Sequence, residues 1–82
     1  MYYAEFKVER LGINEVEGIF YEWLEEDVSE NLLEDWGFGK EGALVGVFVE
    51  FKESGINSGI YLEILLSRYV IAGGQVDVIK EY

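Results

Sequence analysis

Two segments of regular alternation constrain this chain more than any other feature of its sequence. Residues 2–9 alternate between an apolar set and a set of polar or aromatic residues, the apolar set being Tyr2, Ala4, Phe6 and Val8. Residues 43–52 alternate in the same way, with an apolar set of Ala43, Val45, Val47, Val49 and Phe51. A period of two residues is that of a β-strand with one buried face. The sequence therefore predicts a sheet that packs one face against a core.

A helix is predicted between these strands, over residues 14–28. Its apolar residues recur at helical spacing and are Val16, Ile19, Phe20, Trp23, Leu24 and Val28. Asn14, followed three residues later by Glu17, resembles the capping box that begins many helices. The segment 29–35 is open to two interpretations, a short second helix or a brief strand. The glycine-rich segment 37–42 is predicted to be a turn.

The segment 60–72 also has two interpretations, because a nearly continuous apolar run has no decisive period. As a helix it would begin near Asn57 or Ser58 and stop at Gly73-Gly74. As a strand it would use Gly73-Gly74 as a hairpin turn. Its length and its position between two strands favour the helix, and residues 75–81 are then a final strand.

These elements define an α+β domain with a small antiparallel sheet and two helices on one face. If residues 32–38 form a strand, the order is βαββαβ, a ferredoxin-like arrangement. The 82 residues are too few for two cores, so residues 1–82 are predicted to be a single domain. A domain of this size is only marginally stable alone, which makes a homodimer a reasonable expectation.

Negative charge is concentrated in one segment. The net charge is -11, and from Glu15 to Asp35 there are nine acidic residues and no lysine or arginine. Such a surface repels nucleic acid and anionic membranes, so the expected partner is a basic protein, for example one that binds nucleic acid. The predicted partner-binding residues are Glu22, Glu25, Glu26, Asp27, Glu30, Glu34, Asp35 and Trp36. Trp36 is included because tryptophan is enriched at the centres of interfaces.

Two functions are expected from these features. The first is a non-enzymatic interaction module, an inhibitor that occupies the basic nucleic-acid groove of a partner, since carboxylates along this helix approach the charge density of DNA. In this it is similar in general character to small acidic DNA-mimic proteins of phages and mobile elements. The alternative is a small homo-oligomer that binds a ligand or partner chain at its sheet, where Leu44 and Phe48 give the second face an apolar character.

Catalysis, cofactors and metals are not predicted. The chain has no histidine and no cysteine, which removes the commonest general base, nucleophile and metal ligands. Gly37, Gly39 and Gly42 spell GxGxxG but lead into a strand rather than a helix, so phosphate binding is not expected. The acidic residues lack the spacing of a calcium-binding loop.

The segment Phe48-Val49-Glu50-Phe51 resembles the end of the RNA-recognition-motif consensus over four residues. Leu44, Val45 and Gly46 replace the basic and aromatic residues that open that consensus, and the chain is strongly acidic. We interpret the match as shared strand patterning. The N-terminus has no basic region followed by an apolar run and no stretch is long enough to span a bilayer, so a cytoplasmic location is expected.

Overall fold

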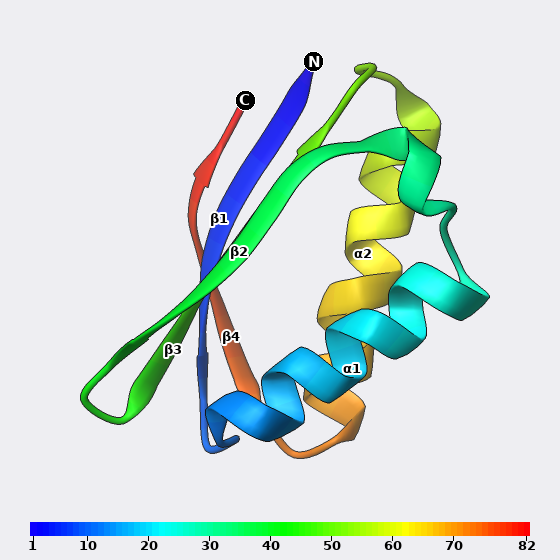
Figure 1. Ribbon diagram of the computed structural model, residues 1–82. Helices are drawn as coiled ribbons and strands as arrows, with labels where there is room; N and C mark the ends of the chain where they lie inside the picture. Colours follow the sequence, from blue (N-terminus) through cyan, green and yellow to red (C-terminus); the bar gives the residue numbers. More distant parts are fainter.

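The computed structural model describes the backbone of residues 1–82 and every side chain except that of Glu30. The elements follow in the order β1 (Tyr2–Glu9), α1 (Ile13–Glu26), the 3₁₀ turn η1 (Glu30–Leu32), β2 (Leu33–Glu41), β3 (Leu44–Phe51), α2 (Ile56–Ile71) and β4 (Gln75–Glu81). The order is therefore βαββαβ. Figure 1 shows one sheet with both helices on the same side of it.

The four strands form one antiparallel sheet in the order β2-β3-β1-β4. Strands β2 and β3 are neighbours in the sheet and are joined by a hairpin, whereas each helix connects two strands that are consecutive in the chain but not adjacent in the sheet. This is the ferredoxin-like α+β arrangement that the sequence predicted. It leaves β2 and β4 as edge strands and gives the sheet one face toward the helices and one open face.

The core lies between the sheet and the helices. The predicted apolar sets of the first and third strands face it, and Phe6, Val45 and Val49 are almost completely buried. From α1 the side chains of Val16, Phe20 and Trp23 enter the core. From α2 it receives Leu62, Leu65 and Tyr69, whose ring lies 5.8 Å from that of Phe6. Ala43 is the exception to the predicted set, because it lies in the β2–β3 turn and is exposed.

Both helices begin earlier than predicted. α1 begins after Gly12 rather than at Asn14, and the Gly12 backbone N–H donates to Glu15 Oε1 at 3.2 Å. The carboxylate of Glu15 thus satisfies one of the free N–H groups at this helix end, a role that the sequence analysis gave to Glu17. α2 begins at Ile56 after Gly55, so neither Asn57 nor Ser58 caps it.

The helical interpretation of the segment after residue 55 is confirmed, as is its stop signal. Gly73 has φ 96°, and its N–H donates to the carbonyl oxygen of Val70 at 3.0 Å. The N–H of Gly74 donates to the carbonyl oxygen of Tyr69 at 2.9 Å. These two bonds form a Schellman motif, for which a glycine in the left-handed region is favoured.

The predicted turn over residues 37–42 is wrong. Residues 37–41 belong to β2, and the turn consists of Gly42 and Ala43 alone. Gly42 has φ 62°, which suits the first position of a two-residue hairpin turn. Trp36 and Phe38 face the helices while Gly37 and Gly39 face away, so the strand alternates between aromatic rings and glycines. The glycines concealed a strand pattern, because glycine is ordinarily a turn signal.

For the segment 29–35, each of the two interpretations, a short helix and a strand, is correct for part of the segment. It forms the short 3₁₀ turn η1 and then enters β2 at Leu33, which is buried. The pairing with β3 shifts by one residue between Leu33 and Asp35. In the described part of the chain, no helix is long and apolar enough to cross a membrane.

Candidate functional site

The acidic residues at the end of α1 surround a single arginine from α2. Arg68 Nε lies 2.6 Å from Asp27 Oδ2, and its Nη2 lies 2.7 Å from Glu26 Oε2. Its Nη1 is 3.6 Å from Glu22 Oε2. Hydrogen bonds first to Asp27 and then to Glu26 raise the pKa of the guanidinium above its ordinary value. Three of the predicted partner-binding acids thus share one positive charge, and their cluster ties α1 to α2.

The acidic residues at the C-terminal end of α1 lie where the helix dipole disfavours negative charge. The C-terminus of an α-helix carries a partial negative charge, so carboxylates there are unfavourable and cations are favourable. Glu25 and Glu26 occupy the last turn of α1, which contains no basic residue. Arg68 supplies the missing cation from another element. This part of the surface therefore holds more negative charge than stability of the helix alone would favour.

The remaining predicted acids do not join that cluster. Glu25 and Glu34 are exposed, and no described cation lies within ion-pair distance of either. Asp35 is exposed and accepts a hydrogen bond from the backbone N–H of Trp36 at 2.9 Å. Its register opposite Glu50 places it on the open face of the sheet. Glu30 lies outside the described side chains. The acidic segment of the sequence therefore contributes to both layers of the molecule rather than to one face.

Trp36 is less available than the sequence analysis expected. Its side chain is half-buried on the helix-facing side of β2, and its ring stacks on Phe20 at a centroid distance of 6.2 Å and an angle of 29°. The other tryptophan, Trp23, is completely buried, and its Nε1–H donates to the Tyr61 carbonyl oxygen at 2.8 Å. Both rings belong to the packing between α1 and the sheet.

A second surface emerges on the open face of the sheet. Three rings form a row across β3, β1 and the C-terminus: Tyr3 stacks on Phe48 at 6.2 Å and on Tyr82 at 5.2 Å. Phe48 was predicted on this face from the sequence, but the contribution of the two tyrosines was not. The alternation of residues 2–9 did place Tyr3 on the face of its strand that points away from the core. Tyr82 follows the last strand, and it joins the row because its backbone is hydrogen-bonded to that of Tyr3.

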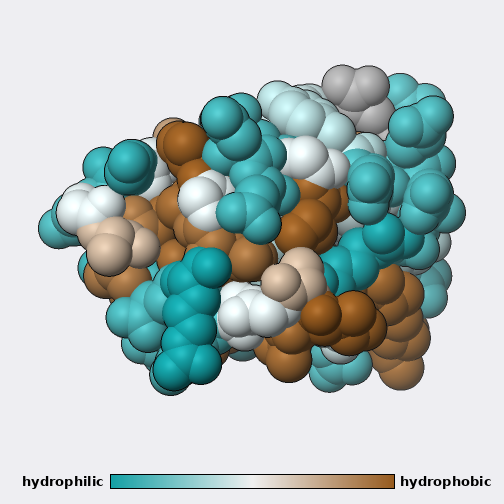
Figure 2. All heavy atoms as spheres, turned by 90° about the horizontal axis from the view of Figure 1, so that it is seen from below, coloured by the Kyte–Doolittle hydropathy of each residue, from teal (hydrophilic) through white to brown (hydrophobic). Residues whose placement is uncertain are grey.

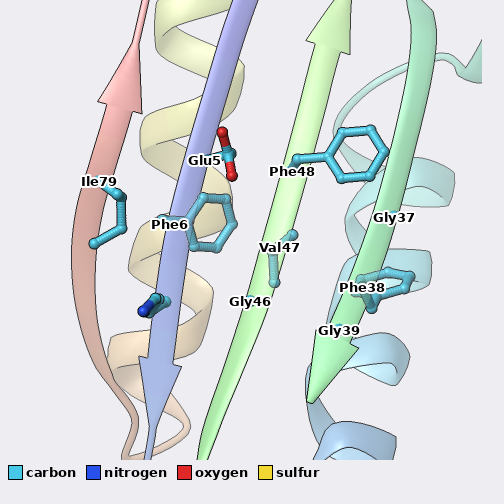
Figure 3. Close-up of a pocket in the computed structure, with 10 residues that line it drawn as sticks. Glu5, Phe6, Gly37, Phe38, Gly39, Gly46, Val47, Phe48 and Ile79 are labelled. Carbon is cyan, nitrogen blue, oxygen red and sulfur yellow. The ribbon is translucent and has the colours of Figure 1, made fainter. Parts of the chain in front are cut away.

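Next to the ring row lies a hollow of about 300 Å³. Figure 3 shows it from the open side, with Glu5 and Phe48 above it, Ile79 on β4 to one side, and Gly39 and Gly46 at its floor. The Phe48 side chain leans from β3 over Gly37 of β2. Burial and then the nearby Glu5 carboxylate raise the pKa of Tyr3 to about 12.

Among the described residues, no group of three or more aspartate or glutamate side chains is arranged to hold a metal ion. Every buried side-chain nitrogen or oxygen described has a hydrogen-bond partner. No protein-family model matches this sequence, and no curated protein matches it either.

Proposed function

We propose that this domain is a non-enzymatic protein–protein interaction module that binds a basic partner through the acidic residues of α1 and the start of β2. The observation that carries the proposal is the acidic C-terminal end of α1, where carboxylates accumulate against the helix dipole. A charge arrangement that costs stability is expected where a surface serves binding. The form of partner that fits best is a protein whose basic groove binds nucleic acid, which this surface would occupy as an inhibitor.

Charge balance supports a basic partner. Around Arg68 stand three carboxylates, so the cluster keeps an excess of two negative charges even with every ion pair formed. Glu25 and Glu34 add two more at exposed positions. A surface of this kind accelerates association with a positively charged groove, and the complex weakens as salt screens the charges.

A charge-reversal variant tests this proposal. Glu25→Lys with Glu34→Lys changes exposed residues that make no described ion pair, so the fold should persist. The wild-type protein, immobilised, is expected to retain proteins from the heparin-binding fraction of a lysate and to release them at moderate salt or with excess duplex DNA. The variant should retain far less of them, because two attractive charges become two repulsive ones.

The matched control is Glu53→Lys with Glu63→Lys, which alters the net charge by the same amount at exposed positions away from α1 and β2. Retention by this control should resemble that of the wild type. Equal loss with both variants would mean that only net charge matters, and retention that duplex DNA does not reverse would contradict the nucleic-acid-groove form of the proposal.

Self-association is a second candidate, and exposed apolar residues on α2 favour it. Ile71 is 85% exposed and Val70 57% exposed, and Val78 of the adjacent edge strand β4 is 43% exposed. Figure 2 shows brown, hydrophobic atoms reaching the surface along the lower side of that view, among teal hydrophilic ones. A second copy covering them would add the buried area that a domain of this size lacks.

Sedimentation equilibrium tests this candidate. A dimer held by these residues should persist at high salt, because its contacts are apolar, and Ile71→Glu should shift it toward monomer. The same shift with Glu63→Lys, which changes charge on α2 without removing an apolar side chain, would indicate an electrostatic contact instead. A monomer at all concentrations would reject the candidate.

A further inference from the structure

Two glycines on the open face have no explanation within the fold. Gly39 and Gly46 are partners in the β2–β3 register. A Cβ atom built on Gly39 would meet no described atom within 4 Å, and on Gly46 the nearest contact would be the Gly39 carbonyl oxygen at 3.6 Å. Gly37 differs, because a Cβ there would clash with the Phe48 ring, which would have to move. The packing of Phe48 thus accounts for the glycine at 37, but no packing contact accounts for those at 39 and 46.

Glycine in a strand interior costs stability relative to alanine, because the glycine backbone loses more conformational freedom on folding. Where no neighbour requires it, such a glycine often marks a place where a ligand or another backbone approaches closely. Here the two glycines adjoin one another across neighbouring strands and form the floor of the hollow. The exposed backbone at this point is accessible to a chain lying across the sheet.

The surroundings of the hollow select the kind of chain. By strand alternation and register the open face holds six carboxylates and two lysines, the carboxylates being Glu5, Glu9, Asp35, Glu41, Glu50 and Asp77. The lysines are engaged: Lys7 Nζ lies 3.7 Å from Glu41 Oε2, and Lys80 Nζ lies 3.7 Å from Glu5 Oε2. Six negative and two positive charges leave an excess of four negative charges.

This excess argues against two other occupants. A second copy would bring two such faces together, and like charges at close range cost affinity. A single-stranded nucleic acid would find rings on which bases stack but no net positive surface for its phosphates, which supply most of the affinity in such complexes. A basic peptide segment matches both the charge and the rings, since arginine and lysine are attracted to carboxylates and to aromatic faces.

We propose that the open face of the sheet is a second interaction surface, which binds an extended basic segment of a partner protein whose backbone crosses Gly39 and Gly46. Its arginine or lysine side chains lie against the row of Tyr3, Phe48 and Tyr82 and among the carboxylates. This surface is on the opposite side of the sheet from α1, so it is tested independently of the acidic cluster around Arg68.

The test uses a fluorescent octapeptide of alternating arginine and valine, titrated with the 82-residue protein and followed by fluorescence anisotropy at low salt. The deciding variant is Gly46→Val, which fills the hollow without changing the charge of the protein. Valine is favoured in strands and its Cβ would meet only an ordinary contact at this position, so the fold should persist, as circular dichroism would verify. We expect peptide binding to weaken by about tenfold or more, because the side chain blocks close approach.

Gly39→Val is the second variant and should act in the same way from the other strand. Gly18→Ala is the matched control, since Gly18 is exposed on α1 and a Cβ there meets no described atom within 4 Å. It should bind the peptide as the wild type does. Amide chemical shifts should move for residues of β1, β2 and β3 around the hollow rather than for α1.

Four results would overturn the proposal. The peptide could bind Gly46→Val and Gly39→Val as tightly as the wild type, or shift only amides of α1, in which case it binds the acidic cluster alone. It could fail to bind the wild type even at low salt. A labelled single-stranded oligothymidine could bind the open face more tightly than the peptide, which would assign this surface to nucleic acid.

Discussion

Replacing Trp23 with alanine is expected to lower the free energy of unfolding by about 3–5 kcal/mol, the largest loss expected from any single substitution discussed for this protein. The ring is completely buried between α1 and the sheet, 5.1 Å from the Phe20 ring and 6.2 Å from that of Phe51. Removing a buried tryptophan side chain costs about 3–5 kcal/mol. A domain of 82 residues has a total stability of about 4–12 kcal/mol, so this loss is a large fraction of the total and, at the lower end of that range, removes all of it.

Urea unfolding followed by far-UV circular dichroism measures this effect. Trp23→Phe separates two contributions, because it keeps much of the apolar volume but removes the Nε1–H that donates to the Tyr61 carbonyl oxygen. Its midpoint should fall between those of the wild type and Trp23→Ala. Tyr21→Ala is the control on the same helix, since Tyr21 is 51% exposed and should cost much less. A wild-type midpoint for Trp23→Ala would contradict the packing of α1 on the sheet.

Stability is expected to fall steeply above pH 10, and Tyr69 is a principal cause. Its ring is completely buried, and its hydroxyl donates to the Val16 carbonyl oxygen at 3.0 Å. Burial raises the pKa of this hydroxyl above its ordinary value of 10.0, because the phenolate would lose its hydration. Above pH 10 the unfolded chain therefore releases a proton that the folded protein keeps.

The sign follows from linkage. Stability falls with pH wherever the folded state binds more protons than the unfolded state, so this contribution is fully present below pH 10 and is lost as the pH rises toward the folded pKa. One such group changes the free energy of unfolding by up to about 1.4 kcal/mol per pH unit. Tyr2 and Tyr3, whose pKa values are raised to about 12, act in the same direction.

Thermal unfolding between pH 7 and pH 11 tests this, with Tyr69→Phe as the comparison. At pH 7 this variant should be less stable by about 0.5–1.5 kcal/mol, the usual net value of a hydrogen bond. As the pH rises above 10, the difference from the wild type should shrink, because the variant has lost the group that opposes folding at high pH. Parallel pH profiles for the two proteins would show that Tyr69 is not buried as the structure places it.

The sequence alone determined the helices and strands that have one apolar face and one polar face. The alternation of residues 2–9 and 44–51 and the helical spacing of Val16, Phe20 and Trp23 each place a set of apolar side chains on one face. Burial of that face then requires a strand or a helix with the corresponding period. For this reason the ferredoxin-like order was predictable once a second strand was allowed, and Gly73-Gly74 marked the end of α2 correctly.

Other features depended on tertiary contacts that have no local signal. Residues 37–41 form a strand because β3 provides a hydrogen-bonding partner and Phe48 covers Gly37, although their glycines favour a turn. The Arg68–Asp27 pair joins residues 41 positions apart, so the acidic segment looked unopposed in the sequence. Tyr82 joins Tyr3 in the same way. The periodicity of a segment records which side of it is buried, but which segments meet is decided only when the layers pack together, because that choice depends on the shape and charge of both partners.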